Sequence, residues 1–237
     1  MIGPVFDAAW EATWPAADYA QVGGFRVGRG MGGGGRVSAA RVTGDWADGD
    51  IPAVEAQHAA WDQPALFAVE DDDPALQGAL AARGYLETSP TLILAAPVAR
   101  LADQPIPPIT ALDAWPPLAI QRELWTEQGI GPARQAVMDR AAQPKVAILG
   151  RTRDRAAGVA FAAVHGAVGM VHAVAVLPQW RRERLAEWMT RRAAGFAAAQ
   201  GARTLALAVS ESNQPALALY GGLGFDRIGR YCYWRRG

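Results

Sequence analysis

Hydrophobic and polar positions alternate most clearly between residues 171 and 176. Val171, Ala173 and Ala175 would point to one side of the chain, and His172, Val174 and Val176 to the other. This period of two is typical of a β-strand. Pro178 ends the predicted strand, because proline has no N–H to give to a sheet ladder.

A helix is predicted directly after this strand. An apolar stripe recurs at spacings of three and four through Leu185, Met189, Ala193 and Phe196. Gly201 then stands where a helix commonly ends. The pattern therefore predicts a strand, a turn and a helix in immediate succession.

The turn between this strand and this helix carries Arg181, Arg182 and Arg184. The first N–H groups of a helix have no intrahelical partner, and the helix dipole places partial positive charge beside them. Together with the arginines these groups favour an anion, and phosphate is the expected ligand.

The same reasoning divides the rest of the chain into short elements. Helices are expected within 1–20, at 51–61, at 74–83, as two segments within 118–142, and at 215–223. Strands are expected at 25–30, 36–42, 65–69, 91–96, 145–150, 158–164, from 167 onward, at 204–209 and at 228–234.

The glycine-rich stretch 31–35 has two interpretations. A phosphate-binding loop of the Gly-Lys-Ser/Thr type would need those residues and a helix directly behind it, and the pattern predicts neither. The stretch is therefore interpreted as a flexible connection between the strands at 25–30 and 36–42.

Four acidic residues at 70–73 precede the helix that is expected from Pro74. A cation would find oxygen ligands there, but carboxylates are also favoured at the start of a helix, where they cap N–H groups and complement the dipole. The capping interpretation is preferred.

A weak internal repeat divides the chain. The helix at 74–83, its Gly84-Tyr85 ending and the strand after it resemble 215–223, Gly224-Phe225 and the last strand. We therefore expect an N-terminal lobe at 1–98, a proline-rich linker at 99–117 and a C-terminal domain at 118–237. The N-terminal lobe has no arginine-rich turn, so its role is expected to be structural.

Composition excludes several classes of function. The chain has 23 basic and 23 acidic residues and a formal net charge of zero, so neither a nucleic acid nor a membrane surface is an expected partner. Cys232 is the single cysteine and the three histidines lack ligand spacing, so no metal site is expected. Without a secretory leader pattern, the expected location is cytoplasmic. The expected assembly is a monomer or a homodimer.

Two motifs in the C-terminal half resemble one known family. Residues 181–186, Arg-Arg-Glu-Arg-Leu-Ala, resemble motif A of the GNAT acyl-CoA N-acyltransferases, in which R/Q-x-x-G-x-G/A cradles the pyrophosphate of coenzyme A. Arg184 stands where that motif has its middle glycine. Residues 213–225, from Asn213 to Phe225, resemble motif B of the same family, N-x-x-A-x-x-L-Y-x-x-L-G-F, at every anchoring position.

The resemblance implies a fold and a cofactor. The implied fold is an α/β (α+β) structure with a mixed, mostly antiparallel sheet and flanking helices, here with a degenerate GNAT-like N-terminal lobe. The implied cofactor is acetyl-CoA. The residues that match the family's cofactor-contacting positions are Val174, Val176, Arg181, Arg182, Arg184, Leu185, Ala186 and Asn213.

The resemblance also implies catalytic roles. Tyr220 matches the family's tyrosine near the sulfur and is the expected general acid; the alternative is a tyrosine that packs the helix onto the sheet. His172, on the expected face of Val174, is the candidate general base; the alternative is a half-buried histidine of the sheet. Trp125, Glu127 and Arg134 fall in the region that forms a wall of the family's acceptor pocket, and solvated helix ends are the alternative.

Three functions follow from the resemblance. The first is an acetyl-CoA-dependent N-acetyltransferase that acts on a primary amine of a small molecule or of a peptide or protein. The second is a protein that binds acyl-CoA without turnover, a possibility that Arg184 raises. The third is a transferase for a longer acyl donor.

Overall fold

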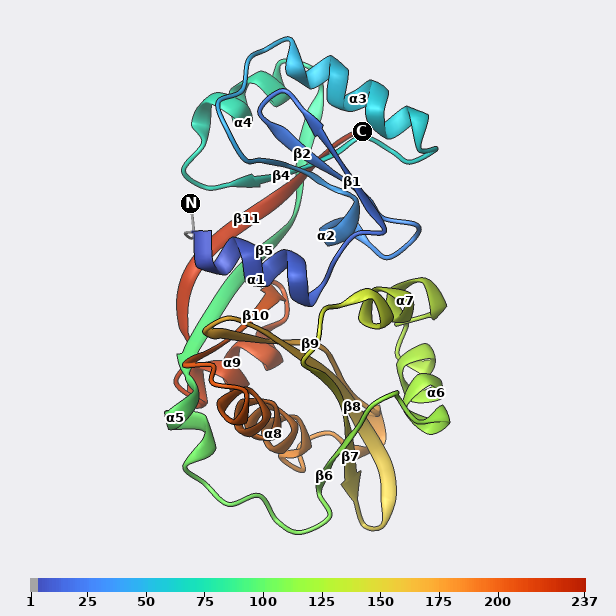
Figure 1. Cartoon of the computed structure of the whole chain (residues 1–237), viewed down its shortest axis with the longest axis vertical. Helices are drawn as coiled ribbons and strands as arrows, with labels where there is room; N and C mark the ends of the chain where they lie inside the picture. The colour runs from blue at the N-terminus through green and yellow to red at the C-terminus, as the bar shows by residue number, and fades with distance from the viewer. Residues whose placement is uncertain (1–3) are drawn as a thin grey trace.

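The computed structural model describes residues 4–237, and all strands of that part of the chain belong to one 11-stranded sheet (Figure 1). The strand order is β1-β2-β3-β4-β11-β5-β10-β9-β8-β7-β6. The strands are β1 (Asp18–Val22), β2 (Phe25–Arg29), β3 (Ala40–Val42), β4 (Leu66–Glu70), β5 (Tyr85–Pro97), β6 (Ala111–Ala114), β7 (Lys145–Thr152), β8 (Arg155–His165), β9 (Val168–Val176), β10 (Thr204–Ser210) and β11 (Asp226–Arg236).

Helices flank this sheet. They are α1 (Pro4–Thr13), α2 (Gly35–Ser38), α3 (Asp50–Ala60), α4 (Pro74–Ala81), α5 (Val98–Ala102), α6 (Ala119–Glu127), α7 (Pro132–Arg140), α8 (Leu185–Ala199) and α9 (Gln214–Gly222), with a 3-10 turn at Pro178–Trp180. The pairs β3·β4 and β9·β10 are parallel and the other strand pairs of the described chain are antiparallel. The expected α/β fold class is confirmed.

The two halves of the chain exchange their last strands at the centre of the sheet. β5 belongs to the N-terminal half by sequence, yet it pairs with β10 from Thr91 to Pro97. β11 ends the C-terminal half, yet it pairs with β4 of the other half. β5 and β11 also pair with each other along most of their length, and Figure 1 shows them side by side through the middle of the molecule. The halves therefore share one continuous sheet.

The order of elements repeats across this exchange. β3-α3-β4-α4-β5 and β9-α8-β10-α9-β11 each contain a parallel strand pair with a crossover helix, followed by a short helix and an exchanged strand. α4 and α9 begin alike: Asp73 and Asn213 each cap their helix by accepting a hydrogen bond from the N–H three residues on, Leu76 and Ala216. The capping interpretation of the acidic residues at 70–73 is thereby confirmed at Asp73.

The stretch expected to be a linker contains regular structure. Most of α5 and all of β6 fall within 99–117, and β6 forms the edge of the sheet beside β7. Asp113 of β6 accepts hydrogen bonds from Arg192 of α8 at 2.9 and 2.7 Å, which fixes the edge strand to the helix that covers it. The sequence did not predict β6, because the strand has only four residues and prolines flank it on both sides. The division into lobes at 1–98 and 118–237 stays a prediction.

A helix opens directly behind the glycine-rich stretch, so the strand expected at 36–42 is wrong in its first half. α2 occupies 35–38 and β3 begins only at Ala40. Gly34 at φ 99° has a backbone conformation that favours glycine. A Cβ on Gly33 would lie 2.7 Å from Val137 of α7, so α7 packs against bare backbone here.

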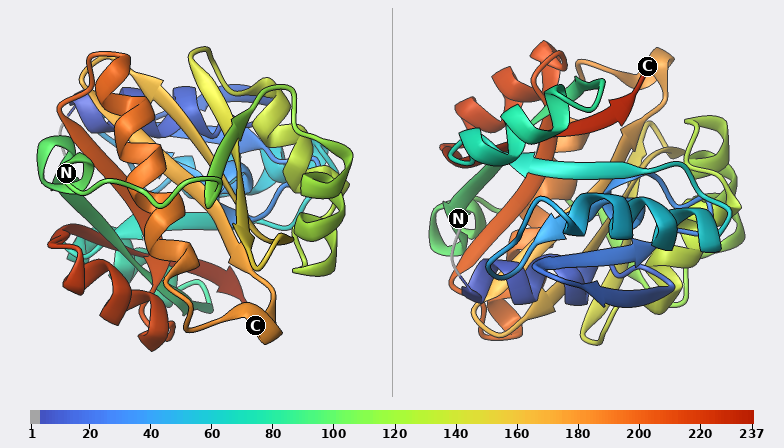
Figure 2. Two further views of the ribbon diagram at one scale, coloured as in Figure 1. Left: turned by 90° about the horizontal axis from the view of Figure 1, so that it is seen from below. Right: turned by 90° about the horizontal axis from the view of Figure 1, so that it is seen from above.

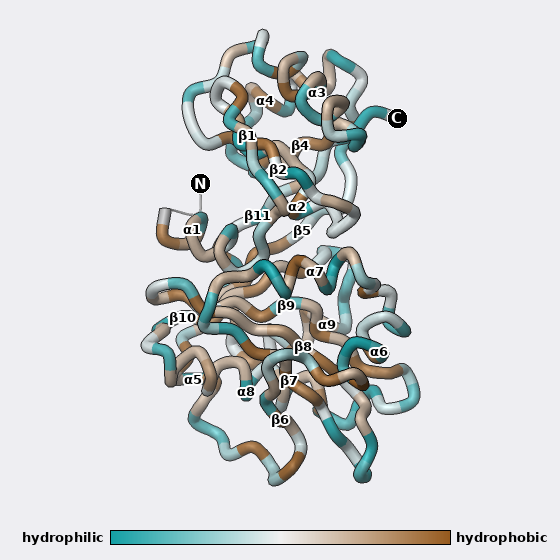
Figure 3. Tube along the Cα trace, turned by 45° about the vertical axis from the view of Figure 1, so that its right-hand side comes forward, coloured by the Kyte–Doolittle hydropathy of each residue, from teal (hydrophilic) through white to brown (hydrophobic). Residues whose placement is uncertain are grey.

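Helices cover the two faces of the C-terminal part of the sheet. Alternate residues of β7 and β8 enter two different hydrophobic clusters: Ile148 and Ala160 pack with α8, whereas Leu149 and Phe161 pack with α6 and α7. α1 lies against β8 and β9 on the face opposite α8. Figure 2 shows α8 lying across the strands, and Figure 3 shows apolar segments concentrated in the sheet.

A third hydrophobic cluster fills the N-terminal half, where α3 and α4 pack against β2 and β4 around Phe25 and Phe67. Within residues 4–237, no helix is both long enough and apolar enough to cross a membrane.

Candidate functional site

The parallel strands β9 and β10 part in the middle of the sheet. They pair only from Val168 to Met170 on β9, opposite Thr204 to Ala206 on β10. Beyond this point β9 continues to Val176 along β8, and β10 continues to Ser210 along β5. Their facing backbone edges are therefore separated beyond Met170, over residues 171–176 at the end of β9, which precede the arginine-rich turn.

A β-bulge changes which side chains of β9 share a face. The register between β8 and β9 shifts near Ala173, whose φ is +51°. Beyond the bulge Val174 and Val176 pack against the α8 cluster, while His172 stacks with Phe161 on the opposite face. The expectation that His172 and Val174 share a face is wrong, because strict alternation assumes a regular strand.

The arginine-rich turn opens α8 without a side-chain cap. Arg182 at φ 69° and Arg184 at φ 59° both adopt left-handed conformations. Arg181 and Arg182 are exposed and form no ion pair within residues 4–237, and Arg181 Nε donates a weak hydrogen bond to the carbonyl of Val176 at 3.3 Å. Positive charge and unpartnered N–H groups therefore meet where β9 ends, as the sequence predicts for an anion site.

Arg184 occupies the motif's glycine position with its side chain folded back along α8. Its Nε and Nη2 donate to the two carboxylate oxygens of Glu187, both at 2.8 Å, and its guanidinium lies 4.6 Å from the Trp188 ring. The hydrogen bonds from Arg184, with Arg191, lower the pKa of Glu187. A left-handed backbone conformation costs a non-glycine residue about 1–2 kcal/mol. The contacts of the Arg184 side chain with Glu187 and Trp188 offset part of this cost.

Glu183 anchors the turn to the β7–β8 connection. Its carboxylate accepts a hydrogen bond from Thr152 Oγ1 at 2.7 Å and pairs with Arg153 at 2.7 Å. A pocket of about 290 Å³ lies here and is lined in part by Thr110, Arg151, Thr152, Arg153, Glu183 and Trp188. The motifs gave no sign of these contacts between Glu183 and residues 152 and 153, because residues 151–155 predict only a charged loop.

Tyr220 of α9 lies in the same hydrophobic cluster as Val174, Val176 and Leu185. Burial raises its pKa to about 12, so its hydroxyl is protonated at neutral pH. Its ring packs edge-on against Phe225 at 5.4 Å between centroids. Asn213, in contrast, is exposed at the start of α9, where its oxygen accepts the N–H of Ala216 at 3.2 Å.

His172 is buried under α1, with both ring nitrogens occupied. Arg36 Nη1 lies 3.1 Å from its Nδ1, and Thr13 Oγ1 lies 3.1 Å from its Nε2. Because arginine can only donate, Nδ1 is the acceptor and Nε2–H is the donor to Thr13. Burial and the charge of Arg36 hold the pKa of His172 well below its usual value.

These contacts leave His172 no free lone pair with which to accept a proton from an amine. The ring is neutral, as a base must be, but its single acceptor nitrogen already binds a guanidinium that stays charged. The geometry therefore gives the role of general base no support, and that assignment stays a prediction.

The corresponding turn of the N-terminal half carries its own anion. Asp50, at the start of α3, accepts hydrogen bonds from the backbone N–H groups of Gly24 at 3.1 Å and Ala47 at 3.0 Å, which lower its pKa. A carboxylate thus lies at the β3–α3 turn, whereas arginines lie at the β9–α8 turn. This difference favours a phosphate only in the C-terminal half.

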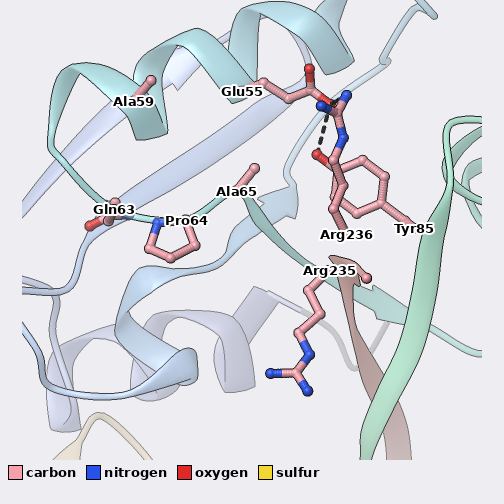
Figure 4. Close-up of a pocket in the computed structure, with 9 residues that line it drawn as sticks. Glu55, Ala59, Gln63, Pro64, Ala65, Tyr85, Arg235 and Arg236 are labelled. Carbon is pink, nitrogen blue, oxygen red and sulfur yellow. Dashed lines mark hydrogen bonds and ion pairs between the residues drawn. The ribbon is translucent and has the colours of Figure 1, made fainter.

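A second pocket, of about 710 Å³, lies in the N-terminal half (Figure 4). Glu55 there accepts hydrogen bonds from the Tyr85 hydroxyl at 2.7 Å and from Arg236 at 2.8 Å. The pocket contains none of the residues that the motifs predict for the site.

Comparison with known proteins agrees with the motifs and the fold. Residues 113–225 match the acetyltransferase (GNAT) family. This match identifies residues 113–225 as a GNAT-type acetyltransferase domain, and both motifs, at 181–186 and 213–225, lie within it. No curated protein matches the chain.

Solved structures of similar fold extend over both halves. A GCN5-related N-acetyltransferase from Kribbella flavida is 18% identical with a TM-score of 0.70, over 95% of this chain and 91% of that one. A functionally unknown conserved protein from Staphylococcus epidermidis is 9% identical with a TM-score of 0.70, over 100% and 98%. A tandem GNAT protein from the clavulanic acid biosynthesis pathway is 16% identical with a TM-score of 0.61, over 83% and 74%. At these identities the likeness concerns the fold.

The left-handed conformation at Arg184 makes a test of the turn possible. Arg184→Ala removes the contacts with Glu187 and Trp188 and keeps a Cβ at φ 59°, whereas Arg184→Gly removes the same contacts and the strain. We expect the glycine variant to be more stable than the alanine variant by about 1 kcal/mol. Urea unfolding measures the difference. Equal stabilities would show that the backbone is not strained there.

The buried His172 predicts a dependence of stability on acid. The pKa of His172 is lower in the folded than in the unfolded state. The neutral ring therefore contributes its full stabilisation above the pKa of the unfolded state, and this stabilisation is lost as the pH falls below about 6.5. His172→Gln should flatten the decline in unfolding free energy between about pH 7 and 5, by up to about 1.4 kcal/mol per pH unit.

Urea unfolding at several pH values measures this slope, with the exposed His165→Gln as the control. Burial also lowers the pKa of His58, so His58 adds a decrease in the free energy of unfolding at acidic pH in every variant. Parallel pH profiles for the parent and His172→Gln would contradict the buried, neutral state of His172.

Proposed function

We propose that the protein transfers an acetyl group from acetyl-CoA to a primary amine by direct attack of the amine on the thioester. The observation that carries this proposal is the position of the arginine-rich, uncapped start of α8 directly beyond the point where β9 and β10 part. The residues at that point suit the cofactor: cationic and N–H groups for its phosphates, and separated strand edges for its extended arm.

Three of the residues that would hold the cofactor, Val174, Val176 and Leu185, lie in one hydrophobic cluster on the α8 face of the sheet. Arg181, Arg182 and the first N–H groups of α8 would bind the pyrophosphate, with Leu185 and Ala186 in that first turn. Val174 and Val176 would line the arm on the α8 side. The bound cofactor supplies an activated acyl group.

The transfer itself needs two proton movements. The amine nitrogen forms a bond to the acyl carbon, the carbon–sulfur bond breaks, and the amine gives up a proton to water or to a base. Tyr220, protonated at neutral pH, donates its hydroxyl proton to the departing thiolate and regains a proton from water, which balances the proton that the amine releases. Tyr220 lies in the same cluster as Val174 and Val176, which supports this role.

A second candidate is a protein that binds acyl-CoA without turnover. Two observations favour it: Arg184 replaces the motif's glycine, and the acceptor nitrogen of His172 is occupied. Turnover by any acceptor would exclude it.

Binding is measured by thermal melts with CoA. A ligand that binds the folded state alone raises stability by about 2.7 kcal/mol at a hundredfold excess over its Kd. A melting temperature that does not respond to millimolar CoA would remove the cofactor assignment.

Turnover is measured by thiol release with a panel of amines and peptides. Tyr220→Phe should lower the rate by about 10²- to 10⁴-fold, because it removes one proton donor, and should leave the response to CoA unchanged. Tyr85→Phe, which removes a hydroxyl in the N-terminal half, is the matched control. A Tyr220→Phe variant as fast as the parent would show that the tyrosine only packs.

A further inference from the structure

Arg36 brings a positive charge from the N-terminal half to the point where β9 and β10 part. Its Nη1 lies 3.1 Å from Nδ1 of His172, and its Nη2 lies 3.7 Å from the sulfur of Met170. Met170 is the last residue of β9 that pairs with β10. The guanidinium therefore spans the last paired and the early unpaired part of β9, on the face opposite α8.

This guanidinium has no carboxylate partner within residues 4–237. Its Nη2 donates to the carbonyl of Trp10 at 3.1 Å, its carbon lies 3.5 Å from the centre of the Trp10 ring, and its Nε is buried without a hydrogen-bond partner. Burial lowers its pKa to about 10, so it stays charged at neutral pH. A buried cation without a counterion is unfavourable, and arginine is well shaped to receive a carboxylate.

Neighbouring arginines are neutralised in the usual way. Arg26 and Arg41 both pair with Glu11, at 3.0 and 2.6 Å, and Arg41 also approaches Asp7. The carboxylates of α1 are thus engaged by these two arginines.

Other donors gather around Arg36. The hydroxyls of Tyr231 and Tyr233 lie 3.2 Å apart on β11. The Tyr231 ring packs edge-on against Trp10, the same ring that the Arg36 guanidinium covers, and the Tyr233 ring lies 3.1 Å from where a Cβ on Gly35 would stand. Nε of Arg134 on α7 lies 3.8 Å from where a Cβ on Gly34 would stand, two residues before Arg36. Arg134 is exposed and takes part in no ion pair within residues 4–237. Two guanidiniums and two hydroxyls thus converge from both halves.

We propose that the acceptor amine carries a carboxylate, and that Arg36, with Tyr231, Tyr233 and Arg134, binds this carboxylate on the α1 side of the parted strands. The proposal rests on the proposed function and names the class of its acceptor. Nε of Arg36 is the donor left for the carboxylate: it is buried without a partner, in a residue of intermediate exposure. The cofactor would approach from the α8 side and the acceptor from the α1 side.

The experiment compares acceptors that differ only in this charge. Amino acids with the amine at increasing distance from the carboxylate, and a dipeptide, are each paired with their carboxamide, and thiol release gives kcat/KM. The acid of the preferred pair should exceed its amide by about 10- to 100-fold, the range for a hydrogen-bonded charge. The dipeptide separates a peptide terminus from a free amino acid as the source of the carboxylate.

Three variants assign the preference to Arg36. Arg36→Met should lower kcat/KM for the acid to the level of the amide, and Arg36→Lys should retain part of the difference. Arg155→Met, which removes an exposed arginine at the start of β8, should leave the preference intact. CoA should raise the melting temperature of all three variants as it does that of the parent.

Two results would overturn the inference: amides that react as well as acids in the parent, or an Arg36→Met variant that keeps the preference. The comparison of acids with amides on the parent protein needs no variant, so it tests the proposal even if Arg36→Met does not fold. If no compound of the panel reacts, melts of the CoA-saturated parent replace thiol release, and equal shifts with acids and amides overturn the proposal. Failure of CoA to bind would instead remove the proposed function.

Discussion

The antiparallel pairing of β5 with β11 is the interaction on which the rest of this structure depends. Each strand comes from one half of the chain and completes the sheet of the other, so neither half has a closed set of hydrogen bonds without its partner. The exchange also sets α1 and α2 of the N-terminal half against β9 of the C-terminal half, where Arg36 reaches His172. The N-terminal half is therefore part of the surroundings of the site.

The two halves repeat one arrangement and differ in the charge at one turn. In both, a parallel strand pair is connected through a helix. Neither α3 nor α8 starts with a side-chain cap, but the turn before α3 holds the carboxylate of Asp50, whereas the turn before α8 holds three arginines. A single local difference in charge thus explains why one half is suited to bind a phosphate and the other is suited to support it.

Local patterns predicted the helix from Leu185 and the cap at Asp73, because spacing and capping chemistry act over a few residues. The fold class was predicted from the resemblance of residues 181–186 and 213–225 to the GNAT motifs. The strand exchange was not predictable, since residues 86–90 of β5 are mostly exposed or half-exposed and are ordered by pairing with β11. The bulge at Ala173 was hidden for a related reason: one extra residue leaves the hydrophobic pattern intact while it moves His172 to the other face. The sequence did not indicate a role for Arg36, because an arginine that follows four glycines is typical of an exposed loop.

The most direct test of the exchange is to divide the chain between Pro105 and Ile106, in the segment between α5 and β6, and to measure the folding of each part by circular dichroism and thermal melting. We expect that neither 1–105 nor 106–237 unfolds cooperatively alone, because β4 and β10 lose their partner strands β11 and β5. Co-expression should restore one soluble complex with a single transition. A fragment 106–237 that folds and melts cooperatively by itself would show that the exchanged strands are not needed for folding.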